Sequence, residues 1–145
     1  MNPPESNPGP TYAGRMKSKG GFDRVTRAFG YTWEGLKAAY HYEHAFRQEV
    51  WALAPFAIAA WVLPHLAIWV RALLFGSLIL ILIVELINSA IEANTDHISL
   101  DRHPLAKRAK DMGSAAVFLA FVNAGLIWTC SLISAYGSKL WSWLI

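Results

Sequence analysis

The residues best suited to chemistry in this chain form a polar stripe within its most apolar part. Glu85 follows the unbroken apolar run from Leu78 to Val84, where a carboxylate is costly and therefore indicates a functional site. At about 100° per helical residue, Asn88, Glu92 and Asp96 fall within about 60° of Glu85. We therefore expect these four side chains to share one helix face.

Glu85 and Glu92 are suited to two separate tasks. They lie roughly 10 Å apart along a helix, which is too far to share a proton. The deeper carboxylate could act as a general base, and the shallower one could hold a cation. Ser89 belongs to the same face. The alternative is a bundle held by interhelical hydrogen bonds, but four acidic or amide groups on one face exceed what that role needs.

Two further carboxylates, Glu43 and Glu49, precede the apolar segments. Each alone is explained equally well as a solvated surface acid. Together with Glu92 they would suit Mg²⁺, because that ion takes one or two protein carboxylates plus phosphate oxygens and waters. A basic cluster further along the chain could neutralise a polyphosphate or merely bind anionic lipid. It comprises Arg102, His103, Lys107, Arg108 and Lys110.

Several familiar catalytic motifs do not occur in the sequence. It has no GxxxxGK[ST] phosphate loop and no HRD or DFG element, which disfavours the soluble kinase architectures. It also has no GxSxG elbow and no HExxH pair. The single Cys130 excludes an intrachain disulfide and a zinc ribbon.

The composition indicates that these residues work in lipid. Of 145 residues, 54% are apolar and only 16% are charged, whereas soluble domains average about 25% charged. The net charge of +3 is too small to indicate a nucleic-acid binder. We therefore expect an all-α membrane protein without a nucleic-acid partner.

The chain divides into four segments by composition. Residues 1–20 are Pro-rich and lack an apolar period, so they are predicted to be disordered. Residues 21–49 have an amphipathic helical period that predicts helices in the membrane interface, as two pieces around a turn at Gly30-Tyr31-Thr32. A soluble helical hairpin is the alternative for this segment. Residues 50–137 contain three predicted spans, and residues 138–145 form a short tail.

The predicted spans cover residues 50–63, 67–94 and 113–136, and the first two are separated by a turn at Pro64-His65. Basic residues precede the first span and lie between the second and third. By the positive-inside rule, the amino terminus and the second connection face the cytoplasm. Trp141 and Trp143 then serve as anchors at the outer interface.

Three stretches of this sequence resemble the prokaryotic diacylglycerol kinase family. They are GYTWEGLKAAYHYEHAFRQE from Gly30, VELINSAIEANTD from Val84 and RAKDMGSAAV from Arg108. The resemblance runs from about Gly21 to Gly137 and includes the order and spacing of the motifs. It implies a homotrimeric helical bundle in the bacterial inner membrane, with an interfacial helix and three spans per subunit and with active sites between neighbouring subunits.

The resemblance also implies a role for individual residues. Glu85 would be the catalytic base, supported by Asn88, while Glu43 and Glu92 would hold the Mg²⁺ that accompanies ATP. The nucleotide would be contacted by Arg24, Tyr31, Glu43, Glu92, Asp96, His103, Lys110 and Asp111. The lipid would be contacted by Arg24, Ala28, Gly30, Tyr31, Trp33, Ala45, Phe46, Arg47, Gln48, Glu49, Arg71 and Ser114. His97 and Asp101-Arg102 depart from the pattern common in the family.

The leading hypothesis is therefore transfer of the γ-phosphate of ATP to the hydroxyl of diacylglycerol, which yields phosphatidic acid. A kinase of the same family that acts on a polyprenol such as undecaprenol is the alternative, because both acceptors present a hydroxyl on a long apolar tail. A small oligomeric ion conductor would also use the polar stripe. It would not explain Glu43, Lys110 and Asp111 on the cytoplasmic side. The third hypothesis is a non-catalytic membrane adaptor, for which Glu85→Gln should leave the function of the chain unchanged.

Overall fold

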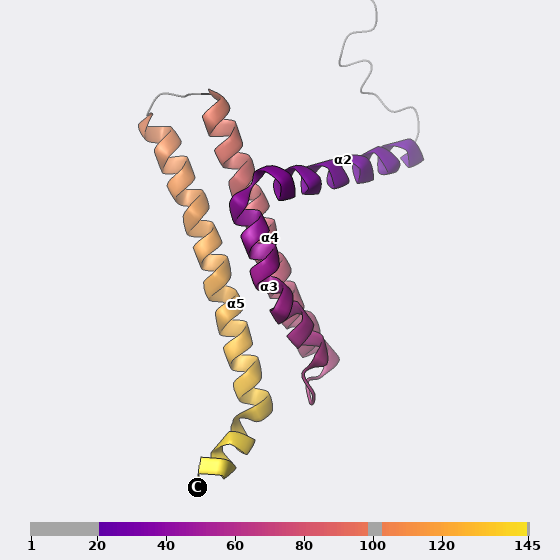
Figure 1. Ribbon diagram of the computed structural model, residues 1–145, viewed down its shortest axis with the longest axis vertical. Coiled ribbons are helices and arrows are strands. Elements are labelled where there is room, and N and C mark those ends of the chain that lie inside the picture. Colours follow the sequence, from indigo (N-terminus) through magenta and orange to yellow (C-terminus); the bar gives the residue numbers. More distant parts are fainter. Residues whose placement is uncertain (1–20, 99–102, 145) are drawn as a thin grey trace, which may run out of the picture. The chain divides into compact units, whose positions relative to one another are not determined.

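The computed structural model describes residues 21–98 and 103–144, with side chains for residues 24–97 and 103–137 (Figure 1). These residues form four helices: α2 (Gly21–Tyr42), α3 (His44–Val62), α4 (Ile68–Ile98) and α5 (Pro104–Leu144). The prediction of an all-helical protein is confirmed for this part of the chain. The chain forms two compact units, Met1–Ala38 and Ala39–Ile145, and each is described by itself. The Pro-rich segment, Arg102 and the side chains of Trp141 and Trp143 lie outside the described residues.

The predicted turn at Gly30-Tyr31-Thr32 is wrong, because α2 runs without a break from Gly21 to Tyr42. A glycine within a helix costs only about 1 kcal/mol of helix stability relative to alanine. Neighbouring residues that favour a helix can offset that cost. The Thr32 hydroxyl donates to the carbonyl of Ala28 at 2.9 Å, so its polar group is satisfied inside the helix. The amphipathic segment is thus one long helix up to Tyr42.

The helix breaks instead at Glu43, whose backbone is extended with φ −95° and ψ 115°. The Arg47 guanidinium donates to the last carbonyls of α2, those of Tyr40 at 2.9 Å and His41 at 2.6 Å. Carbonyls at a helix end lack partners within the helix, so this contact stabilises the end of α2. The Glu43 side chain makes no capping hydrogen bond, which leaves its carboxylate available for other contacts.

The turn predicted at Pro64-His65 is confirmed, because α3 ends at Val62 and α4 begins at Ile68. His65 has a positive φ of 62°, which is uncommon for a residue other than glycine. The Arg71 guanidinium donates to carbonyls on both sides of this turn. The acceptors are Leu63 at 2.6 Å, Ala60 at 3.1 Å, Leu66 at 3.3 Å, and Trp61.

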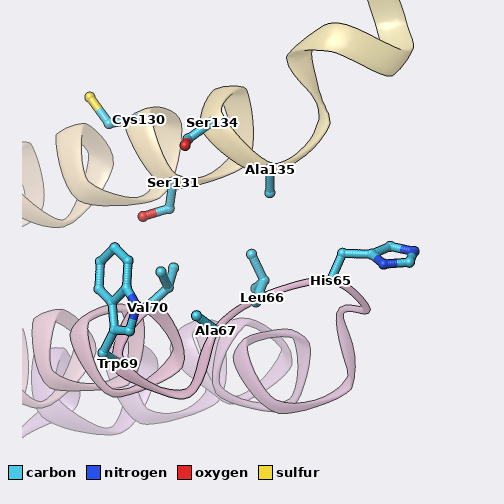
Figure 2. A pocket seen from close by; sticks show the side chains of 9 residues that line it. All are labelled: His65, Leu66, Ala67, Trp69, Val70, Cys130, Ser131, Ser134 and Ala135. Carbon is cyan, nitrogen blue, oxygen red and sulfur yellow. The ribbon is translucent and has the colours of Figure 1, made fainter.

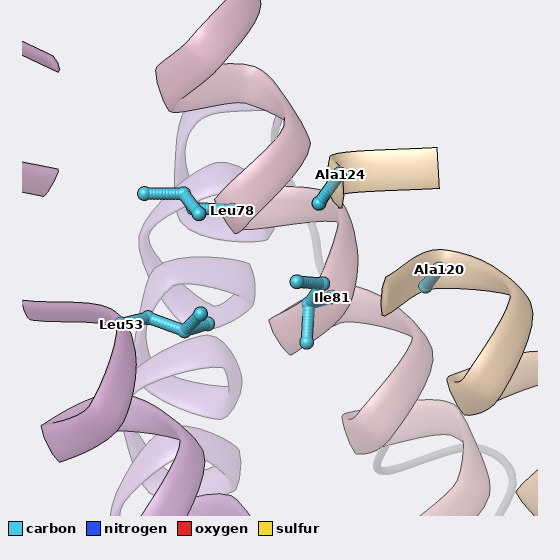
Figure 3. Close-up of a cluster of buried hydrophobic side chains, with 5 residues drawn as sticks. All are labelled: Leu53, Leu78, Ile81, Ala120 and Ala124. Atoms are coloured by element: carbon cyan, nitrogen blue, oxygen red, sulfur yellow. The ribbon is translucent and has the colours of Figure 1, made fainter. Parts of the chain in front are cut away.

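Helix α4 packs against both α3 and α5 (Figure 1). Figure 3 shows the central cluster, in which Leu53 from α3 meets Leu78 and Ile81 from α4 and the small residues Ala120 and Ala124 from α5. The two alanines are four residues apart and therefore lie on one face of α5. Small side chains at such an interface let two helix backbones approach closely. This packing fixes the α4 face that carries Glu85 relative to its neighbours.

Among the described residues, two helices are long and apolar enough to cross a membrane, over Ile68–His97 and Pro104–Gly137. Only 28% and 11% of their most apolar windows are buried within the chain, so most of this apolar surface faces outward. Such helices are typical of a helical membrane protein. Helix α3 does not meet the same criterion among the described residues, because Arg47, Gln48 and Glu49 occupy its first turns. The first span therefore stays a prediction.

The boundaries of α5 show where the basic cluster lies. Most of it is helical and not in a connecting loop, since α5 begins at Pro104 and includes Lys107, Arg108 and Lys110. The helix continues to Leu144, so the predicted tail is helical up to that residue. Helical propensity explains the early start of α5. Ala, Lys, Arg and Leu favour a helix whether or not they lie in lipid.

Candidate active site

The polar stripe of α4 is mostly buried against the neighbouring helices. Glu85 is 3% exposed, and Asn88 and Ser89 are each 8% exposed. The Asn88 amide Nδ2 donates to Glu92 Oε1 at 3.2 Å, so the structure brings these two predicted site residues into contact. Glu92 is half-buried and Asp96 is exposed. The stripe thus runs from a buried acid at Glu85 to a solvent-accessible end at Asp96.

Carboxylates from outside α4 lie near this stripe. Glu85 is within electrostatic range of Glu43, at the break before α3, and of Glu92 on its own helix. Glu49, in the first turns of α3 ahead of the apolar run, interacts with Glu85 in the same way. Within one chain, the Glu43–Glu49 segment therefore lies near the Glu85 part of the α4 stripe. These carboxyl groups bring several oxygen ligands together where a cation could bind.

Glu49 is affected most clearly by this environment. Burial, reinforced by the neighbouring Glu85 carboxylate, raises the pKa of Glu49 from 4.5 to about 7. Its Oε2 atom is buried without a hydrogen-bond partner among the described residues. Functional sites often contain a carboxyl group whose pKa is raised to near neutral pH in this way.

The first turns of α5 supply charge at the exposed end of the stripe. Lys110 Nζ lies 2.6 Å from Asp96 Oδ1, which joins α5 to α4. Lys107 pairs with Asp111 at 2.6 Å along the surface of α5. These are exposed pairs, which contribute little to stability. Their charges remain accessible to a phosphate group from the aqueous side.

His103 lies immediately before α5 and interacts with the start of that helix. Its Nδ1 accepts a hydrogen bond from the Leu105 N–H at 3.2 Å, and its carbonyl accepts one from Lys107 N at 3.1 Å. His103 thereby satisfies an N–H group that the first turn of a helix leaves free. The predicted nucleotide contact of His103 is not tested by this geometry.

Some residues predicted to contact lipid have other partners or lie apart from Glu85. Arg71 lies roughly 21 Å from Glu85 along α4, and its guanidinium is occupied by the carbonyls at the α3–α4 turn. Arg47 is occupied by the end of α2. Phe46 is buried, whereas Ala45, Gln48 and Ser114 are exposed.

The remaining predicted contacts lie on α2, in the first compact unit, which is described by itself. All are exposed there, and the Lys37 ammonium lies 5.2 Å from the centre of the Trp33 ring. The structure therefore leaves the contribution of these residues to a site untested. They are Arg24, Ala28, Gly30, Tyr31 and Trp33.

A cavity of about 380 Å³ lies between the beginning of α4 and the second half of α5 (Figure 2). It contains no carboxylate, and Glu85 lies roughly 22 Å beyond Val70 along α4. This cavity is therefore separate from the polar stripe and lacks the groups that phosphoryl transfer needs. Its lining consists of His65, Leu66, Ala67, Trp69, Val70, Cys130, Ser131, Ser134 and Ala135.

The stripe has the donor chemistry for a hard divalent cation that is shared with a phosphate ligand. No group of three or more His, Cys, Asp or Glu side chains within the described residues is arranged to hold a metal by itself. A magnesium ion needs fewer, since one or two carboxylates plus phosphate oxygens and waters suffice. Glu92 and Glu43 meet that requirement in type. The described residues thus combine a buried acid on an apolar helix with further acids toward an exposed end, an arrangement typical of a site in a membrane protein.

Comparison with known proteins identifies the family. The family model for prokaryotic diacylglycerol kinase matches residues 30–132. The diacylglycerol kinase of Escherichia coli strain K12 is 48% identical over 118 residues, which cover 81% of this chain and 95% of the relative. The diacylglycerol kinase of Pseudomonas aeruginosa is 45% identical over the same shares. That of Helicobacter pylori strain 26695 is 41% identical over 117 residues, which cover 80% and 90%.

The chain therefore belongs to the prokaryotic diacylglycerol kinase family, as its motifs predicted. The prediction that it is a kinase is confirmed by the same relatives.

Proposed function

We propose that the chain transfers the γ-phosphate of ATP to the primary hydroxyl of diacylglycerol at the cytoplasmic face of the membrane. The observation that carries this proposal is the buried carboxylate of Glu85, beside the Asn88–Glu92 hydrogen bond on an apolar helix. A buried carboxylate at this depth can reach a hydroxyl on a lipid, while the exposed end of the stripe stays close to water. The names of the relatives support diacylglycerol as the acceptor.

In this mechanism Glu85 takes the proton from the lipid hydroxyl. The hydroxyl oxygen then forms a bond to the γ-phosphorus while the bond from that phosphorus to the bridging oxygen of ADP breaks. ADP leaves, and the proton on Glu85 passes to water. Asn88 holds the Glu92 carboxylate through its amide. General-base catalysis of this kind contributes roughly 100- to 10,000-fold in rate.

The nucleotide would bind at the exposed end of the stripe. Glu92 and Glu43 would hold Mg²⁺, and Lys110 would offset phosphate charge beside Asp96. Bound with ATP, Mg²⁺ would neutralise part of the charge on the phosphate oxygens during transfer. Asp111 would adjoin the nucleotide from α5. Arg24, Tyr31 and His103 complete the proposed nucleotide contacts.

The lipid would approach Glu85 from the apolar surroundings of α3 and α4. Glu49 is the best supported polar contact on this side, because it lies in electrostatic range of Glu85. Ser114 is exposed on α5, one residue after Gly113. The proposed working state is a homotrimer in the inner membrane of a bacterium, with a cytoplasmic amino terminus. The resemblance of the motifs and the outward apolar surface of α4 and α5 support this assignment.

The proposal is tested by Mg²⁺-dependent transfer of labelled γ-phosphate to diacylglycerol in mixed micelles. Glu85→Gln should lower the rate at least about 100-fold, because an amide cannot accept the proton. Glu92→Gln should also abolish most transfer, and removal of Mg²⁺ with a chelator should stop it. The matched control is Glu34→Gln, which changes an exposed glutamate of α2 and should leave the rate within about twofold of the parent.

Each variant must sediment as the parent does, so that a loss of rate reports chemistry and not assembly. Undecaprenol in place of diacylglycerol tests the alternative acceptor, and a strong preference for the polyprenol would overturn the assignment of substrate. Absence of transfer to either lipid by the folded parent chain would overturn the proposed function. Ion flux through liposomes without nucleotide would then favour the conductor.

A further inference from the structure

Gly113 of α5 lies unusually close to a residue of the polar stripe. It is buried, and a Cβ atom built on it would lie well under 3.0 Å from Asn88 Oδ1, closer than real Cβ atoms approach a neighbour. The same Cβ would lie 3.3 Å from Asn88 Cγ. The α-hydrogen of Gly113 therefore points at the Asn88 amide, and only glycine leaves room for that amide in its present position.

Asn88 has little freedom to yield. Its Nδ2 is committed to Glu92 Oε1, and its Oδ1 is buried without a hydrogen-bond partner among the described residues. A flip of the amide would turn an oxygen toward the Glu92 carboxylate and lose that hydrogen bond. Rotation of the side chain would lose it as well. A larger residue at position 113 must therefore displace Asn88 from Glu92 or push α5 away from α4.

Movement of α5 would also affect the proposed nucleotide site. Lys110 and Asp111 lie within one turn of Gly113 on the same helix, and Lys110 pairs with Asp96 of α4. The contact between Gly113 and Asn88 thus sets both the orientation of the amide and the separation of the two charged helix segments. The other glycine in the middle of α5, Gly125, has nothing within 4 Å of a Cβ built on it.

We infer that Gly113 is a positioning residue for phosphoryl transfer: its lack of a side chain holds the Asn88 amide against Glu92 and α5 against the stripe. This inference deepens the proposed function and rests on it. The atoms nearest to a Cβ at position 113 belong to Asn88, so the effect of a substitution there would pass through Asn88 and the charged turn of α5. The contact involves one residue on each helix, Gly113 and Asn88, so it can be tested by substituting both residues together.

The test compares Gly113→Ala with Gly125→Ala in the full-length chain, with kcat, KM for diacylglycerol and the melting temperature measured in micelles. Gly113→Ala should lower kcat per folded protein at least tenfold, with KM for diacylglycerol within twofold and a melting temperature below that of Gly125→Ala. Gly125→Ala should keep kcat within twofold of the parent. Equal kcat in the two variants, or a loss of melting temperature with full kcat per folded protein, would overturn the inference.

The same substitution made in an Asn88→Ser variant distinguishes a clash with Asn88 from a general packing defect. Asn88→Ser should lower activity by itself, but it shortens the side chain that a methyl group at position 113 would meet. In this background Gly113→Ala should reduce the residual rate less than threefold, and an undiminished tenfold loss would contradict the inference. If Gly113→Ala alone does not fold, the double variant should fold, and its failure to do so would also overturn the inference. An inactive parent chain would instead show that the proposed function is wrong.

Discussion

At the scale of single residues, the site combines acids in different surroundings on neighbouring helices. Glu85 is almost fully buried, Glu92 is held by Asn88, and Glu49 carries one carboxylate oxygen without a partner among the described residues. The environment of Glu49 favours its neutral form, because burial and the nearby Glu85 both oppose a negative charge. Near neutral pH, Glu49 thus keeps its proton in part of the molecules, whereas an exposed glutamate would have lost it.

The raised pKa of Glu49 predicts a pH dependence of stability. Because the folded chain binds this proton more tightly than the unfolded chain, its contribution to stability is complete below pH 4.5 and is lost as the pH rises through about 7. Glu49→Gln should therefore flatten the fall of the melting temperature between about pH 5 and 8, as measured by thermal denaturation in micelles. Glu34→Gln should keep the slope of the parent. A parallel shift of the whole curve in Glu49→Gln would argue against titration of this group.

At the scale of elements, two arginines stabilise helix ends, one before α3 and one before α4. Arg47 closes the end of α2 and Arg71 holds the turn after α3. Both donate to carbonyls at helix ends, which lack partners within their own helices. The turn that Arg71 holds includes His65 at positive φ, so the guanidinium also stabilises a backbone conformation that is unfavourable by itself.

Replacement of Arg71 should lower stability whichever residue replaces it. Arg71→Ala leaves several carbonyls without their donor, and Arg71→Lys cannot reach them all, since a single ammonium replaces a planar fork. We expect each change to reduce the free energy of unfolding by about 2 kcal/mol or more. A denaturation titration in micelles measures the change, with Arg27→Ala of exposed α2 as the control. A raised KM for diacylglycerol at unchanged stability would instead support the lipid contact that the resemblance implies for Arg71.

At the scale of the whole molecule, the distribution of apolar surface and of charge predicts a topology. The described part of α5 exposes large apolar side chains, among them Phe118, Leu119 and Leu126, along a helix that only lipid or another subunit can cover. The basic residues Lys107, Arg108 and Lys110 lie in the first turns of the same helix. This asymmetry predicts that the connection between α4 and α5 faces the cytoplasm.

The topology is testable because the chain has a single cysteine. In a Cys130→Ser background, Leu105→Cys at the start of α5 should react with a membrane-impermeant maleimide only after spheroplasts are opened. Ala67→Cys, in the turn before α4, should react in intact spheroplasts. Both positions are exposed, so access to the reagent and not burial decides the result. The opposite pattern would reverse the proposed orientation and place the polar stripe on the outer side.

The sequence by itself determined the features that depend on neighbours along the chain. The period of Glu85, Asn88 and Glu92 defines one face of a helix, and Pro64-His65 interrupts an apolar run too long for one span. The motifs around these residues were sufficient to indicate the family. The local sequence pattern predicted helix ends less reliably. Gly30 is tolerated inside α2, whereas the break between α2 and α3 lies at Glu43, a residue type that usually favours a helix.

Only the tertiary structure decided which residues meet across helices. The raised pKa of Glu49, the contact of Gly113 with Asn88 and the use of Arg71 at a turn all depend on how α3 and α5 pack against α4. Such contacts join residues far apart in the chain, and their distances follow from the register and separation of packed helices. No local period of the sequence encodes that register, which is set by the fit of side chains such as Leu53, Ile81 and Ala120.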